Sequence, residues 1–142
     1  MEIFDFLDKY GIKADREKGL YVREYINDMA DCMAAADLLI CRSGAITLSE
    51  LEAAGVPSIL IPSPNVAENH QYFNAKVLAD KEAALLIEEK DLSGEKLTEA
   101  VKKLTDDRET LAKYAKNAQK LAILDSNKLI YNEILKLAGE AK

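Results

Sequence analysis

The chain has 142 residues, of which 49% are hydrophobic and 31% charged, and its formal net charge is −6 at pH 7. This length and balance fit one globular domain with a substantial core, and argue against a disordered or repetitive chain. The basic residues are scattered, so the positive footprint of a nucleic-acid binder is missing. No apolar run approaches the roughly 20 residues of a membrane span, and the acidic N-terminus is not signal-like, so a cytosolic protein is expected.

The two cysteines, Cys32 and Cys41, lie in no Cys-x-x-Cys or Cys/His cluster. They are predicted to be small buried apolar residues in a reducing compartment, with a disulfide between them as the less favoured alternative. No group of side chains has the spacing of a metal site, and no cofactor is expected.

The N-terminal part of the chain predicts a helix, a loop and a strand. Apolar residues recur at helical spacing from Ile3 to Tyr10, and Gly11 is a candidate C-cap. Residues 15–19 are polar and predict a loop. Residues 20–26 are rich in Tyr, Val and Ile and predict a strand.

Beyond residue 26 the pattern alternates between helices and strands, which predicts an α/β fold: a Rossmann-like parallel sheet with flanking helices. The last three helices form a C-terminal tail that is expected to pack on or beside the sheet. The predicted elements are a helix capped by Asn27 or Asp28, a strand at 37–41, a helix ending at Ala54 with Gly55 as its stop, a strand at 58–61, a loop at 62–68, a helix at 69–80, a strand at 83–87, and helices around Leu97, Leu111 and Ile130.

The beginning of the chain is unusual for this fold class. A doubly wound domain normally starts with a strand and a phosphate loop, but here a helix comes first and no Gly-x-Gly-x-x-Gly is present. Four short strands would also leave an unprotected sheet edge. Either this is a small, unusual fold, or its first strands lie on another piece of chain; we predict a domain truncated at its N-terminus.

The segment from Ser43 to Glu50 follows a predicted buried strand and opens a helix. A glycine lets the backbone turn sharply and lets a ligand come close, and the free amides and dipole of a helix N-terminus bind phosphate. The hydroxyl of Thr47 can add a donor, and the carboxylate of Glu50 suits the two hydroxyls of a ribose. The alternative is an ordinary turn without a ligand. The amides in question are those of Gly44, Ala45, Ile46 and Thr47.

Two further segments are candidates. His70, the only histidine, and Gln71 open a predicted helix and suit hydrogen bonds to sugar hydroxyls. A general-base role for His70 is disfavoured because no carboxylate partner stands at nearby spacing, and a polar helix start is the alternative. At the end of the first predicted strand, the backbone of Ile26 can meet the edge of a planar base while Met29 covers its face. Plain core packing is the alternative there.

Ordered motifs between Tyr25 and Ala75 carry a family resemblance. They are Tyr25-Ile26-Asn27-Asp28-Met29, the run from Ala36 to Ala45, Ser49-Glu50, the run from Ala53 to Pro57, Glu68-Asn69-His70-Gln71 and Asn74-Ala75. In wording and order they resemble the C-terminal domain of MurG-type glycosyltransferases, which have two Rossmann-like domains (the GT-B fold). These enzymes transfer N-acetylglucosamine from its UDP conjugate to a lipid-linked muramyl peptide in peptidoglycan synthesis.

The resemblance implies a role for each segment. Ile26 would read the uracil with Met29 beside it, the amides at 44–47 would hold the diphosphate, and Glu50 would bind the ribose. His70 and Gln71 would contact the N-acetylglucosamine, and no catalytic residue or metal ligand is implied on this chain. The implied substrate-binding residues are Ile26, Met29, Ser43, Gly44, Ala45, Ile46, Thr47, Glu50, His70 and Gln71.

The resemblance is also incomplete. Ser63 stands where the family often has an aromatic residue, and the family's first donor strand, its Gly-Gly-Ser loop and the whole acceptor domain have no counterpart here. Residues 1–142 are therefore expected to be a partial donor-binding domain, inactive alone, whose acceptor domain lies on the same or a separate chain, at the inner face of the cell membrane. The alternatives are a stand-alone UDP-sugar module, or a domain that dimerises through its sheet edge and binds nothing.

Overall fold

The computed structural model describes residues 9, 11 and 19–140, and the predicted helix from Ile3 to Tyr10 lies almost wholly outside this range. Its centre is a parallel sheet in the order β1-β2-β3. The strands β1 (Leu39–Cys41), β2 (Ser58–Leu60) and β3 (Ala84–Leu86) confirm three of the four predicted strands, each trimmed at its ends.

The predicted strand at residues 20–26 is wrong, because this segment is irregular and joins no ladder. Its aromatic side chains are exposed, Tyr21 at 59% and Tyr25 at 76%. The β propensity of such residues comes from packing on a pleated, half-buried surface, and the segment has no such surface here.

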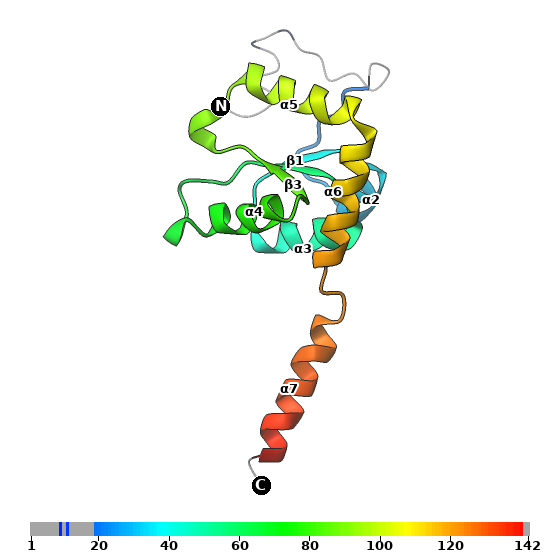
Figure 1. Ribbon diagram of the computed structural model, residues 1–142, viewed down its shortest axis with the longest axis vertical. Coiled ribbons are helices and arrows are strands. Elements are labelled where there is room, and N and C mark those ends of the chain that lie inside the picture. The colour runs from blue at the N-terminus through cyan, green and yellow to red at the C-terminus, as the bar shows by residue number, and fades with distance from the viewer. Residues whose placement is uncertain (1–8, 10, 12–18, 141–142) are drawn as a thin grey trace.

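The helices agree with the predicted alternation (Figure 1). Asp28 is the N-cap residue of the first of them, but its carboxylate pairs with Arg23 at 2.7 Å instead of capping the helix. The helices are α2 (Met29–Ala35), α3 (Ala45–Ala54), α4 (His70–Asp80), α5 (Gly94–Asp106), α6 (Arg108–Leu121) and α7 (Ser126–Glu140), with short 3₁₀ turns η2 (Ala67–Asn69) and η3 (Glu89–Asp91).

Helices cover both faces of the sheet, so β2 is buried on both sides. Leu60 belongs to the core cluster shared with α2, α3 and α4, whereas Ile59 belongs to the opposite cluster shared with α5 and α6. Both side chains are fully buried, as expected for a central parallel strand whose successive residues face opposite ways.

Helix α6 runs past the amino-terminal ends of the strands (Figure 1). Arg108 pairs with Asp37, just before β1, at 3.3 Å, and Lys113 pairs with Glu82, just before β3, at 2.6 Å. Gly55, which precedes β2 and ends α3 at a φ of +67° as predicted, lies against this helix. The carboxyl edge of the sheet is therefore left for the loops that carry the candidate site.

Helix α7 does not pack on the sheet, contrary to the expectation for the whole helical tail. It projects from the body of the molecule (Figure 1), and every described side chain from Ile123 to Gly139 is exposed. Its apolar residues have no partner surface within the described chain. Among the described residues, none of the helices combines the length and apolar character needed to cross a membrane.

Both cysteines are free thiols and only half-buried, so the alternative of a disulfide between them is wrong. Burial raises the pKa of the Cys41 thiol to about 11. A thiol with such a pKa is overwhelmingly protonated near neutral pH and behaves as a small apolar group.

Candidate functional site

The N-terminus of α3 lies at the carboxyl end of β1 and has no side-chain cap. The first backbone hydrogen bond of the helix runs from the Leu48 amide to the Gly44 carbonyl at 3.0 Å. The amides of Ala45, Ile46 and Thr47 therefore precede the helical ladder and are free for an external acceptor. Such amides, at the positive end of the dipole of a ten-residue helix, suit an anion.

Gly44 does not make the sharp turn that was predicted for it. Its φ and ψ are −65° and 145°, an extended conformation that any residue can adopt. A Cβ placed on Gly44 would have only the Thr47 hydroxyl within 4 Å, at 3.9 Å. Neither the backbone conformation nor the packing of the described chain therefore requires a glycine at this position.

Ser43 connects this turn to the start of α4. Its side chain is fully buried, and its hydroxyl donates a hydrogen bond to the carbonyl oxygen of Gln71 at 2.8 Å. The side-chain amide of Asn74 in turn donates to the Ser43 carbonyl oxygen at 3.4 Å. The Ser43 hydroxyl is therefore an internal link, and two segments that were predicted separately lie side by side.

Gln71 is half-buried, and hydrogen bonds hold both its side chain and its backbone. Its side-chain oxygen accepts a hydrogen bond from the Ser63 amide at 3.0 Å, while its own carbonyl accepts from Ser43. This orients the side-chain NH₂ group of Gln71, which donates to no acceptor among the described residues. The loop carrying Ser63, where the family often has an aromatic side chain, is thus tied to α4 through its backbone.

His70 is exposed, and its Nδ1 lies 2.8 Å from the carbonyl oxygen of Ala67. Because a carbonyl oxygen only accepts hydrogen bonds, this contact requires the proton on Nδ1, and Nε2 makes no hydrogen bond to the described residues. Glu68 and Asn69, just before it, both have a φ of 53°, and Asn69 provides no side-chain cap to α4. The alternative prediction for this segment was a polar helix start, and the start of α4 is polar but has no side-chain cap and follows a kink at Glu68. Among the described residues, His70 makes no ion pair.

Glu50 and Met29 border the same hollow, of about 230 Å³, between α2 and α3. Glu50 is exposed and one turn beyond the free amides of α3, and the side chain of Met29 is 40% exposed. Ile26 instead borders a separate, open hollow of about 750 Å³ with residues of the 21–23 segment and α2. Met29 and Glu50 thus border one hollow, whereas Ile26 borders another. The strand end expected at Ile26 is absent, because residues 20–26 form no strand.

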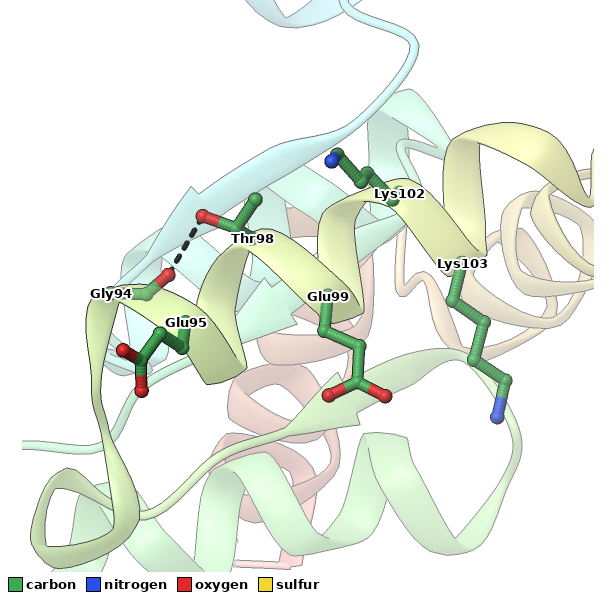
Figure 2. A pocket seen from close by; sticks show the side chains of 6 residues that line it. All are labelled: Gly94, Glu95, Thr98, Glu99, Lys102 and Lys103. Carbon is green, nitrogen blue, oxygen red and sulfur yellow. Dashed lines mark hydrogen bonds between the residues drawn. The ribbon is translucent and has the colours of Figure 1, made fainter.

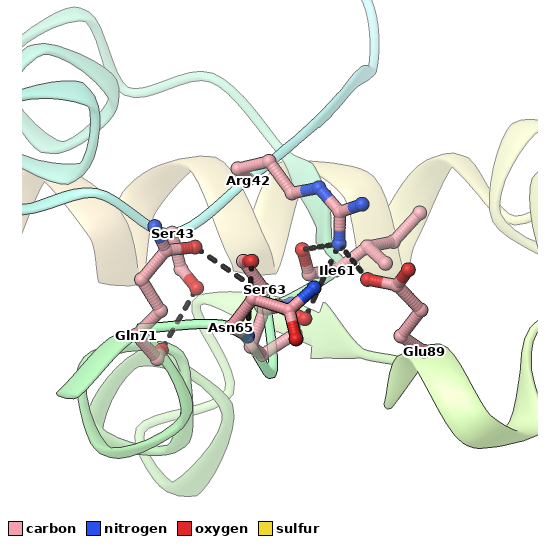
Figure 3. A network of polar contacts seen from close by, with 8 residues as sticks. Arg42, Ser43, Ile61, Ser63, Asn65, Gln71 and Glu89 are labelled. Atoms are coloured by element: carbon pink, nitrogen blue, oxygen red, sulfur yellow. Dashed lines mark hydrogen bonds and ion pairs between the residues drawn. The ribbon is translucent and has the colours of Figure 1, made fainter. Parts of the chain in front are cut away.

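Sequence reasoning missed a network around Arg42, at the end of β1 (Figure 3). The Nη1 group of Arg42 lies 3.2 Å from the Ile61 carbonyl and 3.3 Å from the Pro62 carbonyl, and pairs with the carboxylate of Glu89. Arg42 follows β1, Ile61 and Pro62 follow β2, and Glu89 follows β3. The sequence did contain a signal for this ion pair, because a basic residue follows one predicted strand and an acidic residue follows another. The carboxyl ends of parallel strands meet at one edge of a sheet, so two such side chains can come close.

A wide surface hollow of about 680 Å³ lies on α5 and is no candidate site (Figure 2). One helix alone lines it, with Glu95, Glu99, Lys102 and Lys103 of mixed charge. The hydroxyl of Thr98 donates back to the Gly94 carbonyl at 2.7 Å. Polar groups from different elements do not converge there, as they do at the carboxyl edge of the sheet.

The fold and this edge define the class of the protein. A parallel α/β sheet that presents free helix amides at its carboxyl edge is the arrangement of nucleotide-binding domains. The chain matches the glycosyltransferase family 28 C-terminal domain over residues 7–130, and it belongs to this family.

Two similar proteins from different bacteria carry one name. The chain is 48% identical over 120 residues to the UDP-N-acetylglucosamine–N-acetylmuramyl-(pentapeptide) pyrophosphoryl-undecaprenol N-acetylglucosamine transferase of Thermoanaerobacter sp. (strain X514), covering 84% of this chain and 33% of that one. It is 49% identical over 121 residues to the transferase of that name from Acetivibrio thermocellus, covering 85% and 32%. The chain thus spans about a third of the length of these relatives.

A solved structure agrees with this assignment. The crystal structure of Acinetobacter baumannii MurG is similar at a TM-score of 0.76 and 34% identity, covering 82% of this chain and 33% of that one. The Rossmann-like class predicted from the sequence is therefore confirmed.

Proposed function

We propose that residues 1–142 are a partial donor-binding domain of an N-acetylglucosaminyltransferase. It would hold UDP-N-acetylglucosamine while the sugar passes to a lipid-linked muramyl peptide in peptidoglycan synthesis, the reaction named for its relatives. The observation that carries this proposal is the uncapped N-terminus of α3, with Glu50 one turn along it and Gln71 tied to it through Ser43.

The diphosphate belongs at the free amides of Ala45, Ile46 and Thr47, with Gly44 allowing close approach. Fixed N–H groups and a helix dipole stabilise negative charge that develops on a leaving group, so this turn would stabilise the departing UDP. An extended glycine with open space around its missing Cβ supports this placement.

The nucleoside belongs on the α2 side of that turn. Glu50 borders the hollow between α2 and α3 and would accept hydrogen bonds from the ribose hydroxyls. Met29, on the same hollow, would cover the uracil face, and the backbone of Ile26 would read the uracil edge.

The sugar belongs on the α4 side. The side-chain NH₂ of Gln71 and the Nε2 of His70 are the groups left available by their internal hydrogen bonds. One donates and the other accepts, a combination that suits neighbouring hydroxyls of N-acetylglucosamine.

Transfer requires an acceptor-binding domain that this chain does not supply. We infer that the chain alone is inactive and works with that domain, on the same or a separate chain, at the inner face of the cell membrane. The sheet topology supports this proposal, because β1 is an edge strand that pairs only with β2 among the described residues and leaves its other edge open to a further strand. If the acceptor domain lies on a separate chain, this chain is a module that binds the UDP-sugar and needs that partner for turnover.

The test is a calorimetric titration of the full chain with UDP and UDP-N-acetylglucosamine. Glu50→Ala should weaken UDP binding about tenfold or more, because hydrogen bonds to a charged group contribute about 1.5–3 kcal/mol. Glu99→Ala, an exposed glutamate of α5, is the matched control and should change nothing. No saturable binding at millimolar UDP, or equal binding by Glu50→Ala, would contradict the proposal, and turnover onto a lipid acceptor by this chain alone would contradict its inactivity.

A further inference from the structure

Arg42 ties together the ends of all three strands. One nitrogen of its guanidinium, Nη1, faces the carbonyl oxygens of Ile61 and Pro62 beyond β2 and the carboxylate of Glu89 beyond β3 (Figure 3). Arg42 itself follows β1. Nη1 carries two hydrogens, so its three acceptors share them.

Together with two further hydrogen bonds, these contacts form a closed ring that joins the start of α3 to the start of α4. From Pro62 the chain passes to Ser63, whose amide donates to the side chain of Gln71 at 3.0 Å. The carbonyl of Gln71 accepts from the hydroxyl of Ser43 at 2.8 Å, and Ser43 is the chain neighbour of Arg42. The Arg42–Pro62 contact is therefore the link that completes this ring between the start of α3 and the start of α4.

We propose that Arg42, held by Glu89, is a positioning residue that sets the spacing between the amides at the start of α3 and the side chain of Gln71. The identity of the ligand rests on the proposed function, but the ring itself does not. In that ligand the diphosphate and the sugar are covalently joined, so the two binding groups must stand at a fixed separation.

A direct role for Arg42 as a phosphate ligand makes a different prediction. Glu89 already neutralises the guanidinium, and an anion would have to compete with this carboxylate. If Arg42 bound phosphate directly, Glu89→Gln would free it and strengthen the binding of UDP. If Arg42 positions Gln71, Glu89→Gln loosens the ring and weakens the binding of UDP-N-acetylglucosamine relative to UDP.

The first measurement needs no ligand. Amide hydrogen exchange of the full chain by NMR should show the Ser63 amide exchanging about fivefold faster in Arg42→Gln and Glu89→Gln, the change expected from the loss of about one net hydrogen bond. Arg108→Gln, which breaks the exposed pair with Asp37 at the opposite edge of the sheet, is the control and should leave Ser63 unchanged.

The second measurement is the ratio of the dissociation constants of UDP and UDP-N-acetylglucosamine. Arg42→Gln and Glu89→Gln should lower the preference for the sugar nucleotide at least about threefold while UDP binding changes little, a split that a general loss of stability would not produce. Unchanged Ser63 exchange in both variants, or a parallel loss of both ligands, would overturn the positioning role. Wild-type chain that binds no UDP would contradict the proposed function, whereas the exchange data would still decide the role of Arg42.

Discussion

The hydroxyl of Ser43 donates a hydrogen bond to the carbonyl oxygen of Gln71 at 2.8 Å, across 28 positions of sequence. Ser43 lies in the connection between β1 and α3, and Gln71 lies in the first turn of α4. The contact is fully buried on the serine side, where water cannot replace it. Two segments with separate predicted roles, one for phosphate and one for sugar, thus form a single structural unit.

Ser43→Ala should lower the free energy of unfolding by about 1–2 kcal/mol, because a buried hydrogen bond is lost and its acceptor is left in a dry site. Urea denaturation followed by circular dichroism measures this. Ser49→Ala is the matched control, since the Ser49 hydroxyl is exposed and bonds only to the Ala45 carbonyl of its own helix. The control should stay within about 0.5 kcal/mol of wild type. Equal losses in the two variants would show that the Ser43–Gln71 contact adds nothing.

The fold was largely predictable because its elements have strong local patterns. The apolar run at 37–41 correctly predicted a strand, but not burial on both faces, because Ile40 in β1 is 44% exposed. The strand buried on both faces is the central one, β2, where Ile59 and Leu60 are fully buried. Residues 20–26 failed because a strand needs a ladder partner, which propensity does not supply. The prediction that α7 packs on the sheet failed for a similar reason. The apolar spacing of this helix indicates a face to be covered, but not which surface covers it.

The candidate site was predictable segment by segment, but not as an assembly. The start of α3 was found because a turn after a buried strand has a physical meaning of its own. The Arg42–Glu89 pair and the Ser63–Gln71 bond depend on loop paths and side-chain directions across 47 and 8 positions, which spacing does not encode. Of the two reasons predicted for Gly44, the sharp turn is wrong, because its backbone is extended, and the close approach of a ligand stays a prediction.

Gly55→Ala should destabilise the chain by about 1–2 kcal/mol or more. Gly55 has a φ of +67°, which costs an L-residue about this amount. A Cβ there would also lie 2.4 Å from the side-chain nitrogen of Gln119 on α6, which would have to move. Thermal unfolding of the variant measures the combined cost of the positive φ and of the contact with Gln119.

Two variants separate the causes of that loss. Gly94→Ala is the control, because a Cβ at Gly94 would meet nothing within 4 Å and alanine favours a helix. Adding Gln119→Ala to Gly55→Ala should recover the part due to the collision and leave the part due to φ. A Gly55→Ala protein as stable as wild type would mean that α3 ends differently.

Cys41 should be a slow nucleophile, because burial raises the pKa of its thiol to about 11 from an ordinary value of 9.0. At pH 8 the thiolate fraction falls about 100-fold, and the greater nucleophilicity of a more basic thiolate recovers about tenfold of this. Alkylation by iodoacetamide should thus be about tenfold slower in the folded chain than in guanidinium. Mass spectrometry of a Cys32→Ser variant, which leaves one thiol, measures both rates, and equal rates would rule out the raised pKa.

The same pKa gives a direction to the pH dependence of stability. The folded state keeps the Cys41 proton up to about pH 11, while the unfolded chain releases it from about pH 9.0. The unfolded state thus binds fewer protons between these values, and stability falls as pH rises through this window. Cys41→Ala in the Cys32→Ser background should flatten that part of the curve, and urea midpoints at pH 8, 9 and 10 measure it.

Removal of α7 should leave the fold intact, although this helix carries many apolar residues. In a chain ending at Ala122, every described side chain that is removed, from Ile123 to Gly139, is an exposed one. The free energy of unfolding should therefore stay within about 0.5 kcal/mol of the full chain. Ending the chain at Asp107 is the contrasting variant. It removes Leu111 and Ala118, one from each core cluster, and uncovers the amino-terminal edge of the sheet, so the chain should not fold. Circular dichroism during urea titration distinguishes the two, and a large loss on removing α7 alone would mean that this helix packs on the body in solution.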